Sequence, residues 1–376
     1  MNSLFFFGSL RDPDLLELVI GRPFCSDDIV PAWVEDHVAA CLPNEVYPCL
    51  AKAVGARAEG VLAKDLSETD LARVKFYEDV DYEVAALTVQ TASGPLQTQY
   101  FKGTERLKPT DARWDLAAWQ ETEKSVAMEA ADEFMSHFGS LTSKEAIALW
   151  QGIVIRARMR ARAKAEVPAT GFLRPKRAHG DVITDRIERP YTRYFAIEER
   201  FMRHRRFDGT MSPQIQRTVL TSGDAVTILP YDPKLDRVLL IEQFRTPMHA
   251  RGDACPWGIE AIAGRIDKEL DAEACARREA LEEGGLVLGE VEIIARYYST
   301  PGFAAEHITS FVGAADLSEE GGVFGVADED EDIRAFTLGL DDAVGGVTSG
   351  EINNAPAILS ILWLAQNKDR LRLLWA

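Results

Sequence analysis

Cysteine is scarce in this sequence, and no cysteine stands where a metal site or a redox pair would need it. The 376 residues include five cysteines, and none forms a C-x-x-C pair or joins histidines at the spacing of a zinc site. Disulfides belong mostly to oxidising compartments. We therefore expect reduced thiols in a cytoplasmic protein without structural zinc.

Long apolar runs and surplus positive charge are missing as well. No apolar stretch is long enough to span a bilayer. The short run Leu4–Phe7 ends at Gly8 and no basic segment precedes it, which is unlike a signal peptide. The formal net charge is −18, so the chain repels the phosphates of nucleic acid. We expect neither a membrane nor a nucleic acid to be the main partner.

The composition is that of a folded protein, and the length predicts two domains. Hydrophobic residues make up 46% and charged residues 27% of the chain, and 376 residues exceed what one ordinary core supports. Residues 113–138 and 143–165 have helical patterns, and prolines and glycines in 167–180 are typical of a linker. The predicted parts are a strand-rich domain, a helical connection with a linker, and a second domain, over 1–105, 106–180 and 181–376.

Several shorter segments have the periodicity of single strands or helices. Strands are expected at Leu4–Phe7, Gly60–Ala63, Ala85–Gln90, Leu96–Phe101, Ala225–Tyr231, Val238–Phe244, Val291–Tyr298 and Ser310–Ala315. In the second domain, helices are expected at Ala272–Gly284 and Ala355–Gln366.

The expected helix over 143–165 becomes strongly basic toward its end. Arginine or lysine occupies positions 156, 158, 160, 162 and 164. Such a run either contacts a phosphate-rich ligand or forms a solvated or domain-docking helix face, and the second interpretation is the more common one. We favour the solvated or docking face.

The most informative segment is Gly264–Leu286, GRIDKELDAEACARREALEEGGL. Glu279, Glu282 and Glu283 stand at i, i+3 and i+4, so a helix places them on one face. Their carboxylates repel one another unless a cation lies between them, and oxygen ligands of this kind suit Mg²⁺ or Mn²⁺ rather than zinc. Taken alone, the three glutamates would also fit an exposed acidic helix face.

The residues around these glutamates resemble the Nudix box. A glycine, an Arg-Glu pair, a Glu-Glu pair and a final glycine with an aliphatic residue stand at the family's spacing, at Gly264, Arg278, Glu279, Glu282, Glu283, Gly285 and Leu286. Leu270 departs from the family pattern, which usually has a glutamate there. The resemblance implies an α/β/α sandwich whose loop and helix hold the metals that bridge a diphosphate.

The last half of the chain, from about Tyr194 to Ala376, resembles the bacterial ADP-ribose pyrophosphatase branch of that family. The matching segments include Phe207–Ser212, Leu229–Pro233, Leu239–Arg245, Thr300–Gly302, Ala327–Arg334 and Gly350–Ala355. The resemblance implies Mg²⁺-dependent hydrolysis of ADP-ribose to AMP and ribose 5-phosphate by a homodimer. Another nucleoside diphosphate sugar, such as ADP-glucose or GDP-mannose, is the alternative substrate. The intact glutamates disfavour a module that only binds ADP-ribose.

The same resemblance implies a role for each matching residue. Metal would be held by the Ala263 carbonyl, Glu279, Glu282, Glu283 and Glu331. Substrate would be contacted by Arg217, Glu306, Arg245 near the phosphates, and Tyr194 or Phe195 on the adenine. Glu329, in the acidic loop 328–332, would position or deprotonate the attacking water, which contributes on the order of 10²–10⁴ in rate.

The N-terminal strand runs into a Gly-Ser turn, whose backbone N–H groups can hold a carboxylate. This opening and later aromatic motifs resemble the gamma-glutamylcyclotransferase-like family over about residues 1–105, through Phe7-Gly-Ser-Leu10, Tyr47-Pro48, Phe76-Tyr-Glu78 and Tyr82. The resemblance implies a small β-barrel in which Glu78 moves a proton as an α-amine attacks a γ-amide. Because Phe7 replaces the common tyrosine, a barrel kept for stability, dimerisation or ligand sensing is an equal alternative.

The two resemblances together imply a mixed α/β protein. A gamma-glutamylcyclotransferase-like barrel with helices would precede a Nudix α/β/α sandwich. This combination is similar to that of proteins associated with tellurite resistance, a phenotype that does not define a reaction.

Overall fold

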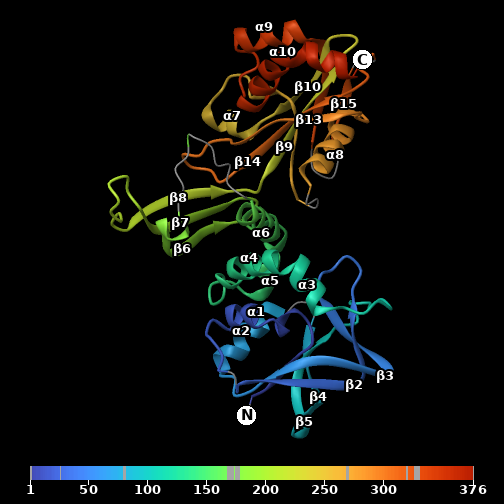
Figure 1. The fold of residues 1–376 in the computed structure, drawn as a ribbon, viewed down its shortest axis with the longest axis vertical. Helices are drawn as coiled ribbons and strands as arrows, with labels where there is room; N and C mark the ends of the chain where they lie inside the picture. The colour runs from blue at the N-terminus through green and yellow to red at the C-terminus, as the bar shows by residue number, and fades with distance from the viewer. Residues whose placement is uncertain are drawn as a thin grey trace. The chain divides into compact units, whose positions relative to one another are not determined.

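A computed structural model describes residues 2–25, 27–78, 82–166, 173, 178–267, 271–318, 321–325 and 331–375. The chain divides into two compact units (Figure 1). The N-terminal unit comprises Met1–Ala178 with Thr192–Tyr194, and the C-terminal unit comprises His179–Tyr191 with Phe195–Ala376. Within the described ranges, no helix combines the length and the apolar character that crossing a bilayer requires.

The N-terminal unit is built on a closed five-stranded barrel. The strands follow one another in the order β1-β3-β2-β4-β5, and β1 closes the barrel by pairing in parallel with β5, Leu4 opposite Gln99. The bounds are β1 (Leu4–Phe6), β2 (Ile29–Cys41), β3 (Pro48–Ala63), β4 (Tyr82–Thr91) and β5 (Gly94–Gly103). The strands predicted in this half are confirmed, and β2 is a strand that the periodicity did not indicate.

Helices of the N-terminal unit share one core with the barrel. They are α1 (Pro13–Ile20), α2 (Glu68–Glu78), α3 (Leu116–Thr122), α4 (Lys124–Met135), α5 (Ser143–Ile147) and α6 (Trp150–Ala165), with a 3₁₀ turn, η1 (Ser9–Arg11). Leu15 of α1, Val74 of α2, Phe134 of α4 and Ile153 of α6 are all buried in this core together with Phe6 of β1. The helices therefore pack against the barrel through their apolar faces.

The two long helices predicted over 113–138 and 143–165 are each divided in two. The first break is at Glu123, which ends α3 and begins α4 with φ −113° and ψ −24°. The second lies at Ala148 and Leu149, where the Leu149 N–H donates to Ala146 in a tighter turn. The helical type and the start at Ser143, where Thr142 and Glu145 form a capping box, were predicted correctly. The two breaks were not predicted, and neither Glu123 nor Leu149 caps the following helix with its side chain.

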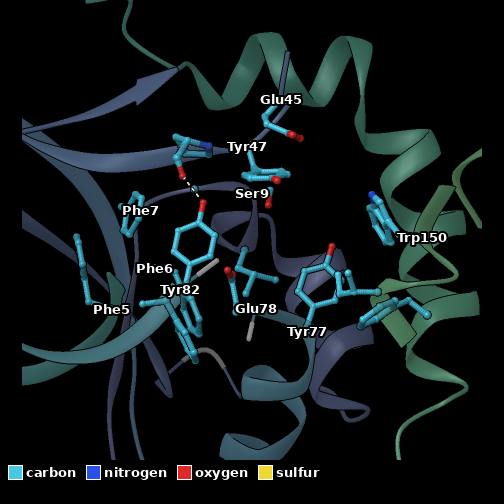
Figure 2. A pocket seen from close by; sticks show the side chains of 16 residues that line it. Phe5, Phe6, Phe7, Ser9, Glu45, Tyr47, Tyr77, Glu78, Tyr82 and Trp150 are labelled. Carbon is cyan, nitrogen blue, oxygen red and sulfur yellow. Dashed lines mark hydrogen bonds between the residues drawn. The ribbon is translucent and has the colours of Figure 1, made fainter. Parts of the chain in front are cut away.

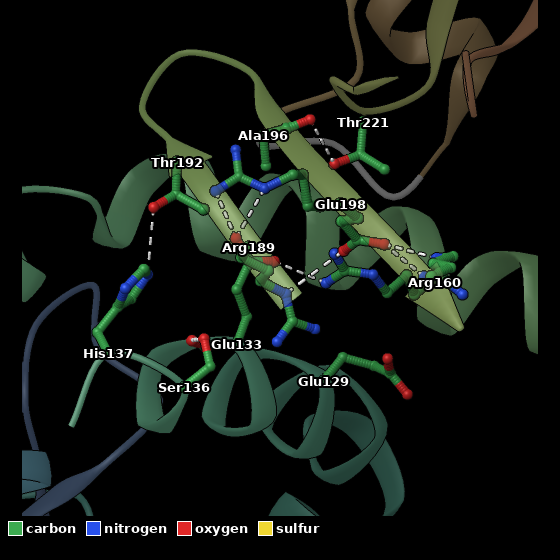
Figure 3. Close-up of polar contacts among 12 residues, drawn as sticks. Glu129, Glu133, Ser136, His137, Arg160, Arg189, Thr192, Ala196, Glu198 and Thr221 are labelled. Atoms are coloured by element: carbon green, nitrogen blue, oxygen red, sulfur yellow. Dashed lines mark hydrogen bonds and ion pairs between the residues drawn. The ribbon is translucent and has the colours of Figure 1, made fainter. Parts of the chain in front are cut away.

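Arg156 on α6 is fully buried against α4 of the same unit, so the solvated or domain-docking face favoured from the sequence is wrong at this position. Its Nε and Nη2 donate to Glu133 Oε1 on α4 at 2.9 and 2.6 Å, and neither side chain is exposed. Arg160, one helical turn later, donates to Glu133 Oε2 at 2.8 Å (Figure 3). The i, i+4 spacing directs both arginines at α4, where they form an internal ion pair network.

The C-terminal unit contains an eight-stranded mixed sheet. Its strands run in the order β13-β14-β9-β10-β16-β15, while β11 pairs with β10 and β12 with β9. The strands are β9 (Ala225–Asp232), β10 (Arg237–Phe244), β11 (Trp257–Glu260), β12 (Ile262–Arg265), β13 (Val291–Tyr298), β14 (His307–Ala314), β15 (Gly322–Phe324) and β16 (Ile333–Gly339). The helices are α7 (Thr246–Arg251), α8 (Ala272–Gly284), α9 (Leu340–Ser349) and α10 (Ala355–Trp375).

Neighbouring residues of the central strand β9 face two different helical layers. Ile228 lies in one core with Ala280 of α8, and Leu229 lies in another with Ile361 of α10. Helix α8 therefore covers one face of the sheet, and α9 and α10 cover the other (Figure 1). This confirms the mixed α/β class with an α/β/α sandwich after a barrel. Helix α10 continues to Trp375, beyond its predicted end.

A separate three-stranded sheet precedes the sandwich. It consists of β6 (Val182–Thr192), β7 (Ala196–His204) and β8 (Ile215–Thr221), in that order. Glu198 on β7 is fully buried and accepts hydrogen bonds from Arg189 Nε at 3.4 Å and Arg200 Nε at 2.7 Å (Figure 3). In the antiparallel pairing of β7 with β8, Arg200 lies opposite Arg217.

Candidate functional site

Helix α8 begins and ends at residues suited to those positions. The Asp271 side chain accepts hydrogen bonds from the N–H groups of Glu273 and Ala274, both at 3.3 Å, and so caps the start of the helix. Gly285 ends the helix with φ +64°, the left-handed conformation that glycine adopts without strain. The helix therefore has fixed limits, and its inner face carries Glu283 among buried apolar residues.

Glu283 is the most deeply buried carboxylate of the helix, at 3% exposure. Its Oε2 accepts a hydrogen bond from the backbone N–H of Ala263 on β12 at 3.1 Å. Burial, together with the nearby negative charges of Glu279 and Glu331, raises the pKa of Glu283 to about 8 against the effect of that hydrogen bond. The position thus favours either a proton or a bound cation at neutral pH.

Glu279 lies one turn before Glu283 and touches the backbone of β12 at Gly264. A Cβ atom on Gly264 would lie 1.9 Å from Glu279 Oε1, so only glycine leaves room for this carboxylate. Burial raises the pKa of Glu279 to about 7, and the charges of Glu282 and Glu331 act in the same direction. Two carboxylates with raised pKa values therefore occupy successive turns of one helix face.

Arg278 forms ion pairs with three acidic side chains, those of Glu282, Glu279 and Asp267. Its Nη1 donates to Glu282 Oε2 at 2.7 Å, and its Nη2 lies 3.0 Å from Glu279 Oε1 and 3.4 Å from Asp267 Oδ1. The Glu282 side chain is 36% exposed, whereas that of Glu279 is 12% exposed. One arginine thus offsets part of the repulsion and holds Glu282 beside Glu279.

Arg245 forms a two-point ion pair next to the same carboxylates. Its Nε and Nη2 donate to the two oxygens of Glu260 at 2.9 and 2.8 Å. Burial is the largest single influence on the pKa of Arg245, and it lowers that pKa. The hydrogen bond and charge of Glu260, with the charges of Glu283 and Glu331, together outweigh burial and raise the pKa. The structure therefore brings Arg245 within electrostatic reach of Glu283 and Glu331.

The carboxylates Glu279, Glu282, Glu283 and Glu331, called here the acidic cluster, fit a hard divalent cation. They offer oxygen donors, two of them carry raised pKa values, and the missing Cβ of Gly264 makes room for the Glu279 carboxylate itself. Within the described parts of the chain, no three acidic, histidine or cysteine side chains already converge on one point. A cation would offset the repulsion that such convergence creates.

Other residues with roles implied by the sequence lie elsewhere. Glu306 directly precedes β14, and its carbonyl accepts a hydrogen bond from the Ser299 N–H at 3.3 Å. Arg217 is on β8, with its Nη1 donating to the Gln216 carbonyl at 2.7 Å. Tyr194 and Phe195 follow β6, with 64% and 41% of their surfaces exposed. Glu329 and Leu270 lie outside the described residues.

A second candidate site is a cavity of about 310 Å³ in the N-terminal unit. Glu78, the last residue of α2, lines it together with the Gly8-Ser9 turn (Figure 2). Burial raises the pKa of Glu78 to about 7. Burial also raises the pKa of Tyr77, and the charge of Glu78 adds to that effect. The Tyr82 hydroxyl donates to the Pro48 carbonyl at 2.9 Å and fixes the ring on the pocket wall.

Comparisons with known proteins agree with this geometry. The family model for the NUDIX domain matches residues 221–355. An ADP-ribose pyrophosphatase of Escherichia coli K12 is 35% identical over 186 residues, which cover 50% of this chain and 88% of the relative.

The chain belongs to the Nudix family.

Further relatives carry two different names. An ADP-ribose pyrophosphatase of Haemophilus influenzae is 32% identical over 187 residues, covering 49% of this chain and 86% of the relative. A GDP-mannose pyrophosphatase of Citrobacter koseri is 35% identical over 149 residues, covering 40% and 77%. The N-terminal half has a separate match, since residues 4–120 fit the family described as gamma-glutamyl cyclotransferase, AIG2-like. The protein is thus a Nudix hydrolase with an N-terminal domain of the cyclotransferase type.

Two carboxylates of the Nudix unit received no role from the sequence. Asp267 reaches Arg278 from the loop after β12, and Glu260 pairs with Arg245 across the β10–β11 hairpin. The two residues of each pair do not lie in one helix or strand, so periodicity does not reveal the contact. The β10–β11 register gives no such signal for Glu260 either, because Glu260 lies opposite Ile241 whereas Arg245 follows Phe244, which lies opposite Trp257.

Gly264→Ala should separate the steric requirement of the Nudix helix from its charge. Because the added Cβ would overlap Glu279 Oε1, we expect the carboxylate to be displaced and hydrolytic activity to fall by roughly 10–100-fold. Overpacking should also lower the free energy of unfolding by about 1–3 kcal/mol. The measurements are initial rates with saturating Mg²⁺ and a urea titration. Gly345→Ala in α9, with no atom within 4 Å of the new Cβ, is the control. A fully active Gly264→Ala would contradict the assigned contact.

Proposed function

We propose that the C-terminal unit hydrolyses the pyrophosphate of ADP-ribose to AMP and ribose 5-phosphate, with Mg²⁺ or Mn²⁺ as cofactor. The observation that carries this proposal is the acidic cluster, in which Glu279 and Glu283 have raised pKa values beside β12. The names of the Escherichia coli and Haemophilus influenzae relatives support the choice of substrate.

The proposed roles are those that the sequence resemblance implies. Metal is held by Glu279, Glu282, Glu283, Glu331 and the Ala263 carbonyl. When bound, the cations neutralise the diphosphate, whose anionic oxygens otherwise repel water. Arg245, oriented by Glu260, faces the phosphates. Arg217 and Glu306 contact the rest of the substrate, and Tyr194 or Phe195 stacks on the adenine. Glu329 takes the proton of the attacking water.

The test is to incubate the full chain with Mg²⁺ and, in separate reactions, ADP-ribose, ADP-glucose and GDP-mannose. We expect AMP from ADP-ribose at the highest kcat/KM. A preference for GDP-mannose, which the name of the Citrobacter koseri relative suggests as the alternative, would replace the substrate but keep the chemistry. No hydrolysis of any nucleoside diphosphate sugar with either metal would refute the proposal.

The proposal also includes the setting of the enzyme. It acts in the cytoplasm as a homodimer, on a small molecule rather than on nucleic acid or membrane. Its two domains are the barrel of residues 1–105 together with helices α3–α6, which share its core, and residues 181–376. A contribution to tellurite resistance would be a consequence of these activities. Size-exclusion chromatography with light scattering tests the dimer.

We further propose gamma-glutamyl cyclotransfer in the N-terminal unit, favoured by the position of Glu78 in the cavity. The α-amine nitrogen of the substrate attacks its own γ-carbonyl carbon, and the γ-amide C–N bond breaks. One proton passes from the attacking nitrogen to the leaving nitrogen through the Glu78 carboxylate. The products are 5-oxoproline and an amine, so no other reactant is needed. The N–H groups of the Gly8-Ser9 turn hold the substrate's carboxylate.

The rate of this reaction should depend on the ionisation of Glu78. Its pKa is raised to about 7, so the proton-accepting carboxylate is scarce below that pH and dominant above it. We expect kcat/KM for 5-oxoproline formation to rise with pH and level off above about pH 7 in assays from pH 5 to 9. Glu78→Gln should lower the rate by about 10²–10⁴-fold. Glu83→Gln, an exposed substitution on β4, is the control. Normal turnover by Glu78→Gln would exclude Glu78 as the proton carrier, and a failure of the unmodified chain to form 5-oxoproline would refute cyclotransfer.

A further inference from the structure

Asn354 lies immediately before helix α10, in a segment to which the resemblance assigned no role. Its Oδ1 accepts a hydrogen bond from the Ala357 N–H at 3.1 Å, and its backbone carbonyl accepts one from the Ile358 N–H at 3.1 Å. Asn354 therefore caps the start of the helix, a position that asparagine and aspartate fill about equally well. The cap uses the oxygen of the side-chain amide and leaves its Nδ2 group for another partner.

The partner of this Nδ2 group is strand β11, 95 residues earlier in the chain. Asn354 Nδ2 donates to the Ile259 carbonyl at 2.6 Å. That carbonyl and the N–H of Glu260 belong to one planar peptide group. A hydrogen bond that holds the carbonyl therefore restrains the direction in which the Glu260 side chain leaves the strand.

Ile259 and Glu260 point to opposite faces of the sheet, because successive side chains alternate along a strand. Ile259 packs against the core that α9 and α10 cover, whereas Glu260 pairs with Arg245, on which the charge of Glu283 from α8 acts. The Glu260 carboxylate also lies directly over the strand, since a Cβ atom on Gly258 would be 2.5 Å from its Oε1. The backbone of β11 therefore determines where this carboxylate lies.

Arg245 in turn takes its orientation from Glu260. Its Nε and Nη2 donate to the two carboxylate oxygens at 2.9 and 2.8 Å, a two-point geometry that holds the guanidinium plane in one orientation. The backbone N–H of Arg245 donates to the Pro256 carbonyl at 2.8 Å, so the main chain is held as well. Among the residues that the structure describes, Nη1 has no hydrogen-bond partner, which leaves it for an anion.

We propose that Asn354 is a positioning residue for the diphosphate of the substrate. It acts through the Ile259 carbonyl and Glu260 on Arg245, the arginine that faces the phosphates. The inference rests on the proposed hydrolysis of a nucleoside diphosphate sugar, and it adds a residue that touches neither the substrate nor a cation. Loss of the Asn354 donor loosens Arg245 and leaves the acidic cluster as it is.

Asn354→Asp removes the donor and keeps the helix cap. Aspartate still accepts the Ala357 N–H, but its carboxylate repels the Ile259 carbonyl. With the full chain and Mg²⁺, we expect KM for ADP-ribose to rise about tenfold and kcat to change less than about twofold, because Arg245 holds the phosphates before and during the reaction. The melting temperature should stay close to that of the wild type, since the cap is intact.

The matched control is Asn367→Asp, the same chemical change on the same helix. Asn367 Nδ2 donates to the Trp363 carbonyl one turn earlier in α10, at 2.9 Å, so this variant should keep the wild-type KM. Gly258→Ala approaches the Glu260 carboxylate from β11 itself, and it should raise KM as Asn354→Asp does. A wild-type KM in Asn354→Asp, or an equal rise in Asn367→Asp, would overturn the proposal.

A double variant shows whether Asn354 acts through Arg245. In Arg245→Met, adding Asn354→Asp should change KM by less than about twofold, because no guanidinium remains to be positioned. A residue that only stabilised the fold would have the same effect in both backgrounds. If Asn354→Asp raises KM as much without Arg245 as with it, the proposed route is wrong.

A measurement that needs no reaction distinguishes failure of the positioning from failure of the proposed function. In the full chain labelled with ¹⁵N-arginine, the Nε–H signal of Arg245 is identified by its loss in Arg245→Met. Its exchange with water should be about tenfold faster in Asn354→Asp than in the wild type or Asn367→Asp. If no nucleoside diphosphate sugar is hydrolysed, this result still supports the contact between Asn354 and Arg245. Unchanged exchange in Asn354→Asp would overturn the role of Asn354, whatever the activity.

Discussion

Glu283→Gln is expected to lower the rate of ADP-ribose hydrolysis by roughly 10²–10³-fold, because loss of one ligand charge removes several kcal/mol of transition-state stabilisation. Glutamine keeps the shape of the side chain, and its carbonyl oxygen can still accept the Ala263 N–H. The measurement is AMP formation by chromatography over a range of Mg²⁺ concentrations. We expect the concentration of Mg²⁺ needed for half-maximal rate to rise as well.

The stability of this variant separates a catalytic loss from misfolding. The pKa of Glu283 is raised from an ordinary 4.5 to about 8 in the folded protein, so the folded state holds a proton that the unfolded state has lost. Below about pH 4.5 the group is protonated in both states and does not oppose folding. As the pH rises through about 8, the folded state loses its proton as well, and the free energy of unfolding has fallen to its lower limit. Without metal at pH 8.5, Glu283→Gln should therefore unfold at the same or a higher temperature than the wild type.

The control for this experiment lies on the same helix. Glu273→Gln changes a partly exposed carboxylate in the first turn of α8 that pairs with Arg277 rather than with Arg278. It should keep wild-type activity and Mg²⁺ dependence. Wild-type hydrolysis by Glu283→Gln would show that the metal is held elsewhere.

Arg156→Met should lower the free energy of unfolding of the N-terminal unit by about 3–5 kcal/mol, because it leaves a buried carboxylate with less compensation. Glu133 and Arg156 have no exposed side-chain surface, and they are joined at 2.6 Å. Arg160 still pairs with the other Glu133 oxygen at 2.8 Å, which favours the lower part of that range. Hydrogen exchange of peptides from α4 and α6, followed by mass spectrometry in increasing urea, measures the loss locally.

Two further variants define what the buried pair contributes. Lys102→Met breaks the surface pair with Glu83, in which both side chains are more than half exposed, and should cost at most about 1 kcal/mol. Adding Glu133→Gln to Arg156→Met should restore part of the lost stability, because the uncompensated charge is removed. If Arg156→Met were no more harmful than Lys102→Met, burial would not be the source of the effect.

The sequence was most informative where function depends on residues close together in the chain. The spacing of Glu279, Glu282 and Glu283 predicted a shared helix face, and α8 has the bounds Ala272–Gly284 that the pattern indicated. The preceding Gly264 matched the family's motif, but its physical role was not evident until the structure placed Glu279 Oε1 against it. The strand patterns at Ala225–Tyr231 and Val238–Phe244 likewise predicted β9 and β10, but not their central place in the sheet.

Predictions from local pattern were weaker where a contact joins distant segments. The basic run on α6 had the composition of a solvated face, yet Arg156 is buried against Glu133, which is 23 residues earlier in the chain. The continuous helical periodicity over 113–138 gave no sign of the break at Glu123. The burial of Arg156 depends on a partner that a periodic pattern does not contain, and the break at Glu123 has no side-chain cap that could have marked it.

The sequence by itself determined the type of chemistry, because a metal-binding helix and its glycine are encoded within the 23-residue segment quoted above. The sequence also placed Glu78 directly after Phe76 and Tyr77, the motif that resembles the cyclotransferase family. Only the tertiary structure decided which side chains meet there, since Trp150 reaches the cavity of Glu78 from a helix whose sequence position carries no information about that distance. Local hydrogen bonding fixes helices and turns, whereas burial and charge pairing between remote segments fix the environment of each reactive group.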